Sequence, residues 1–293
     1  MDCGGKQRFG RFNRYVTMPF SKGTEPMTRS PGMFIWYELM TPDAAAAKAF
    51  YDAVVGWTID SKSSAPDGTM DYRMIARGDG GFAGGMLALS DEMLANGARP
   101  GWLGYLHVKD VDAAAAAIAA EGGSIHMPPH TMPGVGRMAM LADPQDAPIY
   151  LMTPTPPADN PDAESDVFSV DQPQHVRWNE LQSSDPEASV GFYTNHFGWS
   201  QQGEMDMGPM GKYRFVQHDG VGIGAVMGKM PEPPLSAWFF YFGVDDIDRA
   251  VAAVTVGGGT LNGAIMQVPG GDFSVHCSDP QGAAFGLVGP RKV

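Results

Sequence analysis

The chain carries an internal repeat. Residues 34–57 read FIWYELMTPDAAAAKAFYDAVVGW, and residues 176–199 read VRWNELQSSDPEASVGFYTNHFGW. Residues of the same kind recur at a constant spacing of 142 positions (178 minus 36): Trp36 and Trp178, Glu38 and Glu180, Leu39 and Leu181, Asp43 and Asp185, Phe50 and Phe192, Tyr51 and Tyr193, Gly56 and Gly198, Trp57 and Trp199. Further on, LADPQDAPIYL (141–151) corresponds to CSDPQGAAFGL (277–287) at a spacing of 136, which places a six-residue deletion in one intervening loop. Such a pattern indicates a duplicated domain.

The repeat predicts the domain boundaries. We expect an N-terminal extension at 1–32, a first domain at 33–153, a linker at 154–174 and a second domain at 175–290. The linker is rich in Pro, Asp and Ser, which is typical of a connection between domains. The extension is basic but lacks the apolar stretch of a signal peptide. We expect the native chain to begin near Met27, with residues 1–26 either a cloning remnant or the product of an upstream start.

Composition excludes several classes of function. The 293 residues are 43% hydrophobic and carry a formal net charge of −13, with two cysteines. That charge and the lack of a basic patch argue against nucleic-acid binding, and two cysteines argue against a disulfide framework. No apolar run approaches the roughly 20 residues of a membrane span. We therefore expect a soluble cytoplasmic protein, monomeric or homodimeric, whose partner is a small molecule and not a nucleic acid or a membrane.

Each half of the chain predicts the same order of elements twice. The segment 34–40 has strand composition, and Thr41-Pro42-Asp43 is typical of a helix start. Apolar residues then follow at helical spacing up to a terminal glycine at Gly56. Strands are expected at 70–77, 82–89 and 102–108, a second helix at 113–120, and strands at 124–126, 136–142 and 147–152. The unit is one strand, one helix and three strands, so the fold class is α+β.

This βαβββ unit, with Asp at the helix start, FY within the helix, GW after it and a late DPQ turn, resembles the vicinal oxygen chelate superfamily. That superfamily includes glyoxalases, bleomycin-resistance proteins and extradiol dioxygenases. The resemblance covers about residues 33–290 and is closest to the tandem two-domain, glyoxalase-like group. It implies that two βαβββ modules in each domain form a half-open β-barrel cup, and that the ligand lies in the cup.

The resemblance also implies a divalent metal ion, but the expected ligand positions lack donors. Three positions in each half correspond to the family's ligands, and they hold Trp36, Leu103 and Tyr150 in the first half and Trp178, Phe239 and Gly286 in the second. The strands at 80–89 and 220–228, which would supply a further ligand, contain no His, Asp, Glu or Gln. Protein metal sites need three or four N, O or S donors. We therefore expect no metal and no other cofactor.

Strand alternation predicts which side chains line each cup, because residues two apart share a face. The candidate ligand-binding residues are Trp36, Glu38, Tyr105, His107, Trp178, Glu180 and Tyr241. Glu38 and Glu180 are also the candidate catalytic residues, since a buried carboxylate is costly without a role. Two other interpretations remain open: the aromatic residues are core, and each glutamate pairs with Arg73 or Arg214. Because Gly243 takes the place of His107, we expect the first cup to have the richer polar set.

Three functions follow, in order of preference. The first is a metal-independent protein that binds or sequesters an aromatic or cationic compound. The second is a metal-free lyase, isomerase or hydroxylase-like enzyme with a cup glutamate as general base. The third is a metal-dependent glyoxalase or dioxygenase. Two other histidine arrangements carry less weight: His126 and His130 flank Pro128-Pro129, which predicts a loop, and His276 and Cys277 point to opposite faces of one strand.

Overall fold

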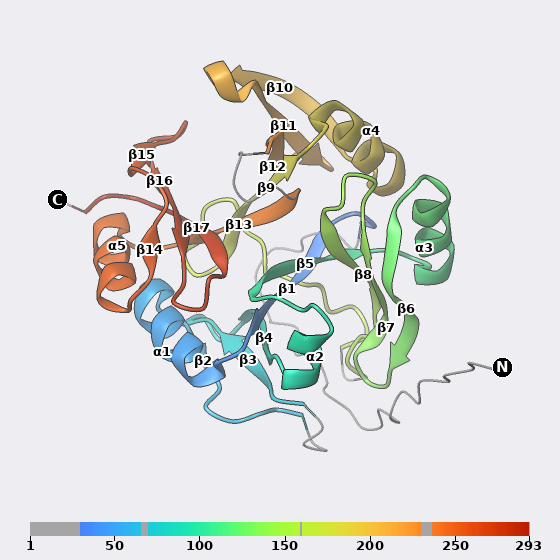
Figure 1. Ribbon diagram of the computed structural model, residues 1–293, viewed down its shortest axis with the longest axis horizontal. Helices are drawn as coiled ribbons and strands as arrows, with labels where there is room; N and C mark the ends of the chain where they lie inside the picture. Colours follow the sequence, from blue (N-terminus) through green and yellow to red (C-terminus); the bar gives the residue numbers. More distant parts are fainter. Residues whose placement is uncertain (1–29, 66–69, 159, 230–235, 293) are drawn as a thin grey trace.

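A computed structural model describes residues 30–65, 70–158, 160–229 and 236–292. The first half of the chain folds into one eight-stranded sheet and three helices, which lie between the strands in sequence (Figure 1). In chain order its elements are β1 (Phe34–Thr41), α1 (Ala44–Val55), β2 (Thr58–Ile59), β3 (Tyr72–Ala76), β4 (Phe82–Ala88), α2 (Asp91–Ala95), β5 (Gly101–His107), α3 (Val111–Ala120), β6 (Ser124–Met132), β7 (Gly136–Ala142) and β8 (Pro148–Pro154).

The second half repeats this arrangement as a separate nine-stranded sheet. Its elements are β9 (Val176–Ser183), α4 (Pro186–Phe197), β10 (Ser200–Asp206), a 3₁₀ turn at Gly208–Met210, β11 (Lys212–His218), β12 (Val221–Gly228), β13 (Ala237–Gly243), α5 (Ile247–Val256), β14 (Thr260–Leu261), β15 (Met266–Gln267), β16 (Phe273–Ser278) and β17 (Ala284–Gly289). The fold is therefore α+β with two tandem domains of two modules each, as predicted.

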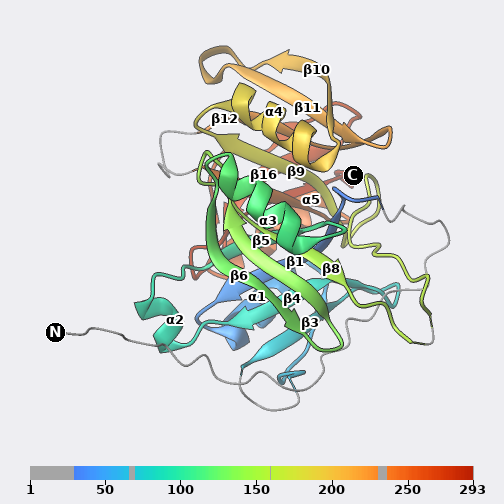
Figure 2. The same cartoon turned by 90° about the vertical axis from the view of Figure 1, so that its right-hand side faces the viewer.

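The two modules of each domain meet at the centre of its sheet. The strand order is β2-β3-β4-β1-β5-β8-β7-β6 in the first domain and β10-β11-β12-β9-β13-β17-β16-β14 in the second. The first strands of the two modules, β1 with β5 and β9 with β13, pair antiparallel. Trp36 lies opposite Tyr105, and Trp178 lies opposite Tyr241. Both sheets curl without closing (Figure 2), so each domain is an open cup.

The repeated aspartates stand at the helix starts, as the sequence predicts, but the cap of the first helix is Asp43 and not the Thr41 hydroxyl. Asp43, Asp110, Asp185 and Asp246 are the N-caps of α1, α3, α4 and α5, and each side chain accepts a hydrogen bond from a backbone N–H of the first turn. An N-cap of this kind contributes about 1 kcal/mol to helix stability. The glycine of each GW motif ends its helix with a positive φ, 87° at Gly56, in the left-handed region that favours glycine.

The repeated FY and DPQ motifs bind the two domains to each other. The Tyr51 hydroxyl of α1 donates a hydrogen bond to Asp279 Oδ2 of the second domain over 3.1 Å. The Tyr193 hydroxyl of α4 makes the equivalent bond to Asp143 Oδ2 of the first domain, also over 3.1 Å. All four side chains are buried. In Figure 1, α1 lies beside α5 of the other domain, and α4 lies beside α3.

The GW motifs complete this two-fold arrangement. Trp57 Nε1 donates to the carbonyl oxygen of Gln174, and Trp199 Nε1 donates to that of Gly32, each over 2.8 Å. The two acceptors are themselves 142 positions apart. Since the helices and these contacts occupy the space between the domains, the opposite face of each sheet is left to line its cup.

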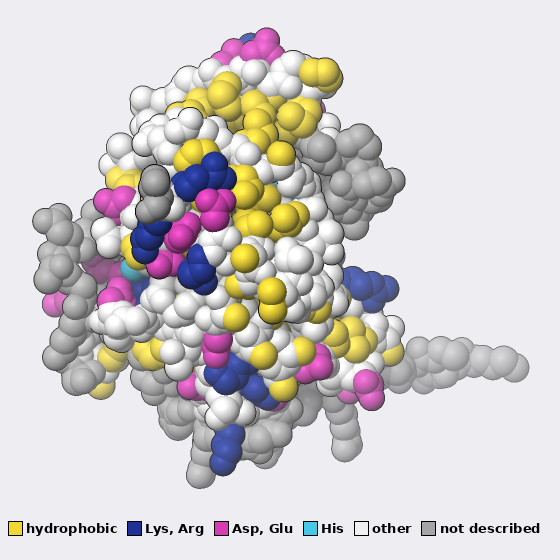
Figure 3. Space-filling view, turned by 90° about the vertical axis from the view of Figure 1, so that its left-hand side faces the viewer, with side chains coloured by type: hydrophobic (Ala, Val, Ile, Leu, Met, Phe, Trp, Pro, Cys, Tyr) yellow, Lys and Arg dark blue, Asp and Glu magenta, His cyan; other side chains and the backbone are white. Residues whose placement is uncertain are grey.

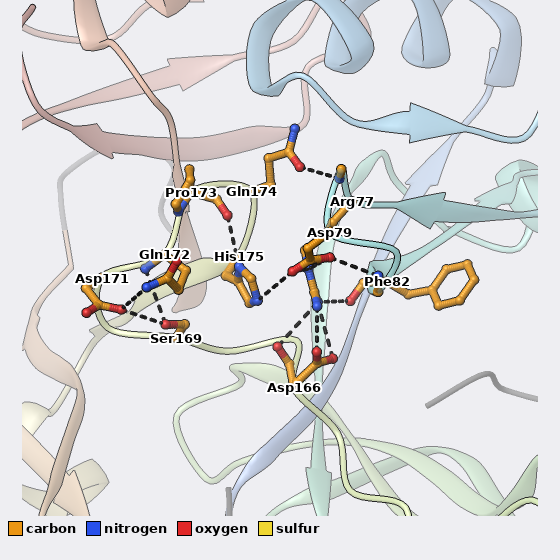
Figure 4. A network of polar contacts seen from close by, with 12 residues as sticks. Arg77, Asp79, Phe82, Asp166, Ser169, Asp171, Gln172, Pro173, Gln174 and His175 are labelled. Atoms are coloured by element: carbon orange, nitrogen blue, oxygen red, sulfur yellow. Dashed lines mark hydrogen bonds and ion pairs between the residues drawn. The ribbon is translucent and has the colours of Figure 1, made fainter. Parts of the chain in front are cut away.

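The chain between β8 and β9 is anchored to the first domain by a polar network (Figure 4). The buried Arg77 guanidinium forms ion pairs with Asp166 Oδ2 at 2.5 Å and Asp79 Oδ1 at 3.1 Å. His175 Nε2 lies 3.9 Å from Asp79 Oδ2, and Gln174 Oε1 accepts from the Gly78 N–H over 2.6 Å. The segment expected to be only a connection therefore packs against the first domain, and its later part also pairs with the second, where Phe168 bridges Val176 and the Gln174 N–H donates to the Gly243 carbonyl oxygen.

One local prediction was wrong. The stretch with His126, His130 and Pro128-Pro129 is not a loop but the strand β6. β6 lies at the edge of its sheet, and its pairing with β7 is irregular between Ile125 and His130. Proline is tolerated there because an edge strand with a bulge does not need every N–H for pairing. No helix among the described residues is long and apolar enough to cross a membrane.

Candidate ligand sites in the two cups

The first cup gathers a glutamate and aromatic side chains from four strands. Glu38 and Trp36 come from β1, Tyr72 from β3, Tyr105 from β5 and Tyr150 from β8. The Tyr105 hydroxyl donates to Glu38 Oε2 over 3.0 Å, and Trp36 Nε1 donates to the Tyr72 hydroxyl oxygen over 2.8 Å. The rings of Tyr105 and Tyr150 stack with centroids 4.2 Å apart.

Glu38 is buried without a counter-ion in the described part of the chain. Its side chain is 4% exposed, and Oε1 has no hydrogen-bond partner among the described residues. Burial raises the pKa of Glu38 to about 7, although hydrogen bonds from Tyr105 and Tyr72 act in the opposite direction. Burial, with the carboxyl group nearby, also raises the pKa values of Tyr72 and Tyr105. The carboxyl therefore changes protonation state near neutral pH, with one oxygen available for a new donor.

In the second cup the glutamate accepts more hydrogen bonds than in the first. Glu180 Oε2 accepts hydrogen bonds from the hydroxyls of Tyr213 and Tyr241, each over 2.9 Å. Glu180 Oε1 accepts from Gln182 Nε2 over 3.0 Å. Trp178 Nε1 donates to the Tyr213 hydroxyl oxygen over 2.7 Å, as Trp36 does to Tyr72 in the first cup. Both carboxylate oxygens of Glu180 therefore accept hydrogen bonds, whereas Glu38 Oε1 has no partner among the described residues.

His276 adds a titratable group to the second cup. Its Nε2 is hydrogen-bonded to the Tyr241 hydroxyl and lies 3.7 Å from Glu180 Oε1. The ring stacks on Phe239 with centroids 5.6 Å apart. The side chain is 34% exposed, so the imidazole connects the buried glutamate to the surface of the cup.

The two cups differ in openness. Trp36, Tyr105 and Tyr150 are less than 9% exposed and belong to the main hydrophobic core. In the second cup Trp178 and Tyr213 are only half-buried, and the buried residues Phe239, Tyr241 and Val288 form a small separate cluster. Figure 3 shows hydrophobic side chains in a band that descends from the top, where β10 lies in Figure 1. The second cup is therefore the more accessible site.

The structure reverses the expected ranking of polar groups. Gln182 and His276 stand where the first half has Met40 and Met140, so the second cup has the richer polar set. His107 is half-buried at the end of β5, in register with Met152 of β8. His107 was predicted to line the cup because it shares a face with Tyr105 on one strand.

The residues at the family's metal positions do not fit a metal ion. Tyr150 stacks on Tyr105, and a Cβ at Gly286 would lie 2.2 Å from the Tyr241 ring, so the tyrosine takes the space of a carboxylate. Among the described residues no group of three or more His, Cys, Asp or Glu is placed to hold a metal. The cups have aromatic rings where a metal site needs donors.

The structure brings together most of the residues that the sequence singled out. Trp36, Glu38 and Tyr105 form one group, and Trp178, Glu180 and Tyr241 form another. The suggested ion pair with Arg73 is absent, because Arg73 pairs with Asp71 at 2.7 Å. The predicted ligand-binding set left out further members of both groups: Tyr72, Gln182 and Tyr213, together with Tyr150 and His276, which the sequence singled out only as a former metal position and as a neighbour of Cys277. For Gln182 the signal was available, since it lies two residues after Glu180 on the same strand.

The fold and the site together define a class of protein. It has two tandem domains of βαβββ modules with the family's fold, but its metal-ligand positions hold residues that are not metal donors. The chain belongs to the Glyoxalase/Bleomycin resistance protein/Dioxygenase superfamily, whose family model matches residues 34–149 and 172–287. It is 30% identical over 260 residues to "Putative glyoxylase CFP32" of Mycobacterium tuberculosis, covering 87% of this chain and 94% of the relative. It is also 28% identical over 290 residues to "Anthracycline biosynthesis protein DnrV" of Streptomyces peucetius, covering 91% and 96%.

Solved structures show the same fold at low sequence identity. The Mn(II)-bound glyoxalase from Novosphingobium aromaticivorans has a TM-score of 0.59 at 15% identity, covering 90% of this chain and 83% of that one. The 2,2',3-trihydroxybiphenyl 1,2-dioxygenase from Sphingomonas wittichii has a TM-score of 0.60 at 13% identity, covering 89% and 91%.

Proposed function

We propose that this protein binds a small aromatic compound without a metal ion, in cups where a glutamate is the polar anchor. The observation that carries the proposal is the pair of buried glutamates on the cup faces, each held by tyrosine hydroxyls. Glu38 is bonded by Tyr105, and Glu180 by Tyr213 and Tyr241. Apolar and aromatic walls with a few placed polar groups are typical of small-molecule sites.

The second cup is the proposed principal site. Trp178 and Tyr213 are half-buried and can offer ring faces to a ligand. The relatives named for anthracycline biosynthesis support a polycyclic aromatic ligand, because anthracyclines are aromatic polycycles. A ligand that also carries a positive charge would gain from Glu180, since a cation is attracted both to aromatic faces and to a carboxylate.

Binding can be tested through the tryptophan fluorescence of the purified protein. Polycyclic aromatic probes with and without an amino group should quench the emission, and Trp178→Leu should weaken their binding. Glu180→Gln should weaken the amino probes by about 1–3 kcal/mol and the neutral probes by much less. Unchanged affinities in both variants, with a lowered melting temperature, would assign Trp178 and Glu180 to the scaffold alone.

Metal independence has its own test. Protein purified without chelators should contain far less than one equivalent of Zn, Ni, Fe or Mn by elemental analysis, and a strong chelator should leave probe binding unchanged. One equivalent of such a metal would refute the proposal of a metal-free site.

One observation favours a second candidate function, an enzyme that uses Glu38 as general base. The pKa of Glu38 is raised to about 7, the range in which a carboxyl can both take and give a proton at neutral pH. The unpartnered Oε1 is the atom that would accept a substrate proton. Turnover of a ligand by the wild type but not by Glu38→Gln would distinguish this function from binding alone.

A further inference from the structure

We infer that the second cup is a proton-transfer site in which His276 is the catalytic base and Tyr241 and Glu180 orient it. The inference rests on the proposed binding of an aromatic compound in this cup. The substrate class is an aromatic ketone with a C–H bond next to its carbonyl group. The reaction is a keto–enol isomerisation or proton exchange at that carbon.

The hydrogen bonds of the Tyr241 hydroxyl determine the tautomer of His276. The Tyr241 hydroxyl has one proton, and it donates this proton to Glu180 Oε2 over 2.9 Å. The same oxygen is bonded to His276 Nε2, so the nitrogen must supply the proton of that second bond. Neutral His276 therefore carries its proton on Nε2, and its other ring nitrogen, Nδ1, has the free lone pair.

The hydrogen bonds from His276 through Tyr241 lead to the Glu180 carboxylate, both of whose oxygens already accept hydrogen bonds. Glu180 accepts from Tyr213, Tyr241 and Gln182, so the carboxylate is held in one position. Glu180 Oε1 lies 3.7 Å from His276 Nε2. A base oriented by a hydrogen-bonded group, which is itself fixed by a third group, is the general arrangement of a catalytic base.

The surroundings of His276 give the base access to a substrate. Its side chain is 34% exposed, in contrast to the 3% of Glu180. The ring is steadied by stacking on Phe239 of β13, and the half-buried Trp178 of β9 lies opposite Tyr241 of β13. The first cup has Met140 at the equivalent position, so this chemistry belongs to the second cup alone.

The step conserves atoms and electrons. His276 Nδ1 takes the proton from the carbon beside the carbonyl, and the electron pair of the broken C–H bond forms the enolate, with its charge on the carbonyl oxygen. The imidazolium then returns a proton to the same carbon or to the oxygen. No oxidant, reductant or second substrate takes part.

The test follows deuterium exchange of 2-tetralone, 2-indanone and anthrone in D₂O by NMR, with binding measured separately by tryptophan fluorescence. The wild type should accelerate exchange above buffer for at least one probe. His276→Gln should remove about 10²-fold or more of that acceleration while the Kd changes less than twofold. Tyr241→Phe should retain binding and lose part of the rate. The control His126→Gln changes an exposed histidine of β6 and should behave as the wild type.

The outcomes separate this inference from the proposed function. Binding without accelerated exchange, or full acceleration in His276→Gln, would overturn the catalytic role and leave the binding function in place. An absence of both binding and exchange with all three probes would overturn both.

Discussion

Replacing Glu38 by glutamine should make the protein more stable above neutral pH. Burial raises the pKa of this carboxyl from 4.5 to about 7, so the folded state holds the proton more tightly than the unfolded state. Its contribution to stability is full below pH 4.5 and is lost as the pH rises through 7. The shift corresponds to about 3 kcal/mol between these limits, since one pKa unit is about 1.4 kcal/mol.

Glutamine stays neutral across this range and keeps an oxygen that can accept from Tyr105. Glu38→Gln should therefore lose the part of the pH dependence that belongs to this residue. At pH 8 we expect a gain of about 1–3 kcal/mol in the free energy of unfolding, after allowance for a weaker hydrogen bond from Tyr105. At pH 5 the variant and the wild type should agree within about 1 kcal/mol. Guanidinium denaturation at both pH values measures the difference.

The matched variant Glu180→Gln should behave differently. Glu180 accepts hydrogen bonds from Gln182, Tyr213 and Tyr241, and a glutamine has only one oxygen to replace the two. It should destabilise the protein by about 2 kcal/mol at pH 8, where Glu38→Gln is expected to stabilise it. The reasoning fails if Glu38→Gln shows the same loss of stability between pH 5 and pH 8 as the wild type.

Three further variants test the interface, the linker and the lost metal position. Tyr51→Phe should lower the free energy of unfolding by about 1–3 kcal/mol, because the buried Asp279 loses its donor from the other domain; no change in denaturation would contradict the interface role. Arg77→Met should cost about 2 kcal/mol and speed proteolysis of the chain between β8 and β9, since it leaves two carboxylates without their cation. Gly286→Asp should lower the melting temperature without creating a metal site, because its Cβ meets the Tyr241 ring at 2.2 Å; tight binding of one Mn²⁺ would refute this.

The duplication and the element order can be predicted from the sequence because each depends on local chain properties. An aspartate caps the helix that follows it, as Asp43 caps α1, whatever the rest of the fold does. Strand alternation is equally local, and it placed Trp36 and Glu38 on one face before any partner was known. The same rule placed Trp178 with Glu180.

The partners of these side chains depend on pairings between distant strands. Glu38 is bonded not by Arg73 but by Tyr105, which is 67 residues away along the chain. His276 reaches Tyr241 from 35 residues away, and β6 is a strand despite its prolines because it lies at a sheet edge.

The interface between the two domains likewise has features that the sequence predicts and features that depend on the tertiary structure. The sequence alone determined that the FY, GW and DPQ motifs occur twice, and the tertiary structure alone decided that each tyrosine meets the aspartate of the other domain. The physical reason is that a hydrogen bond between remote residues depends on the register of the sheets and the docking of the helices. Those are set by the packing of the whole core, and no short stretch of the chain specifies them.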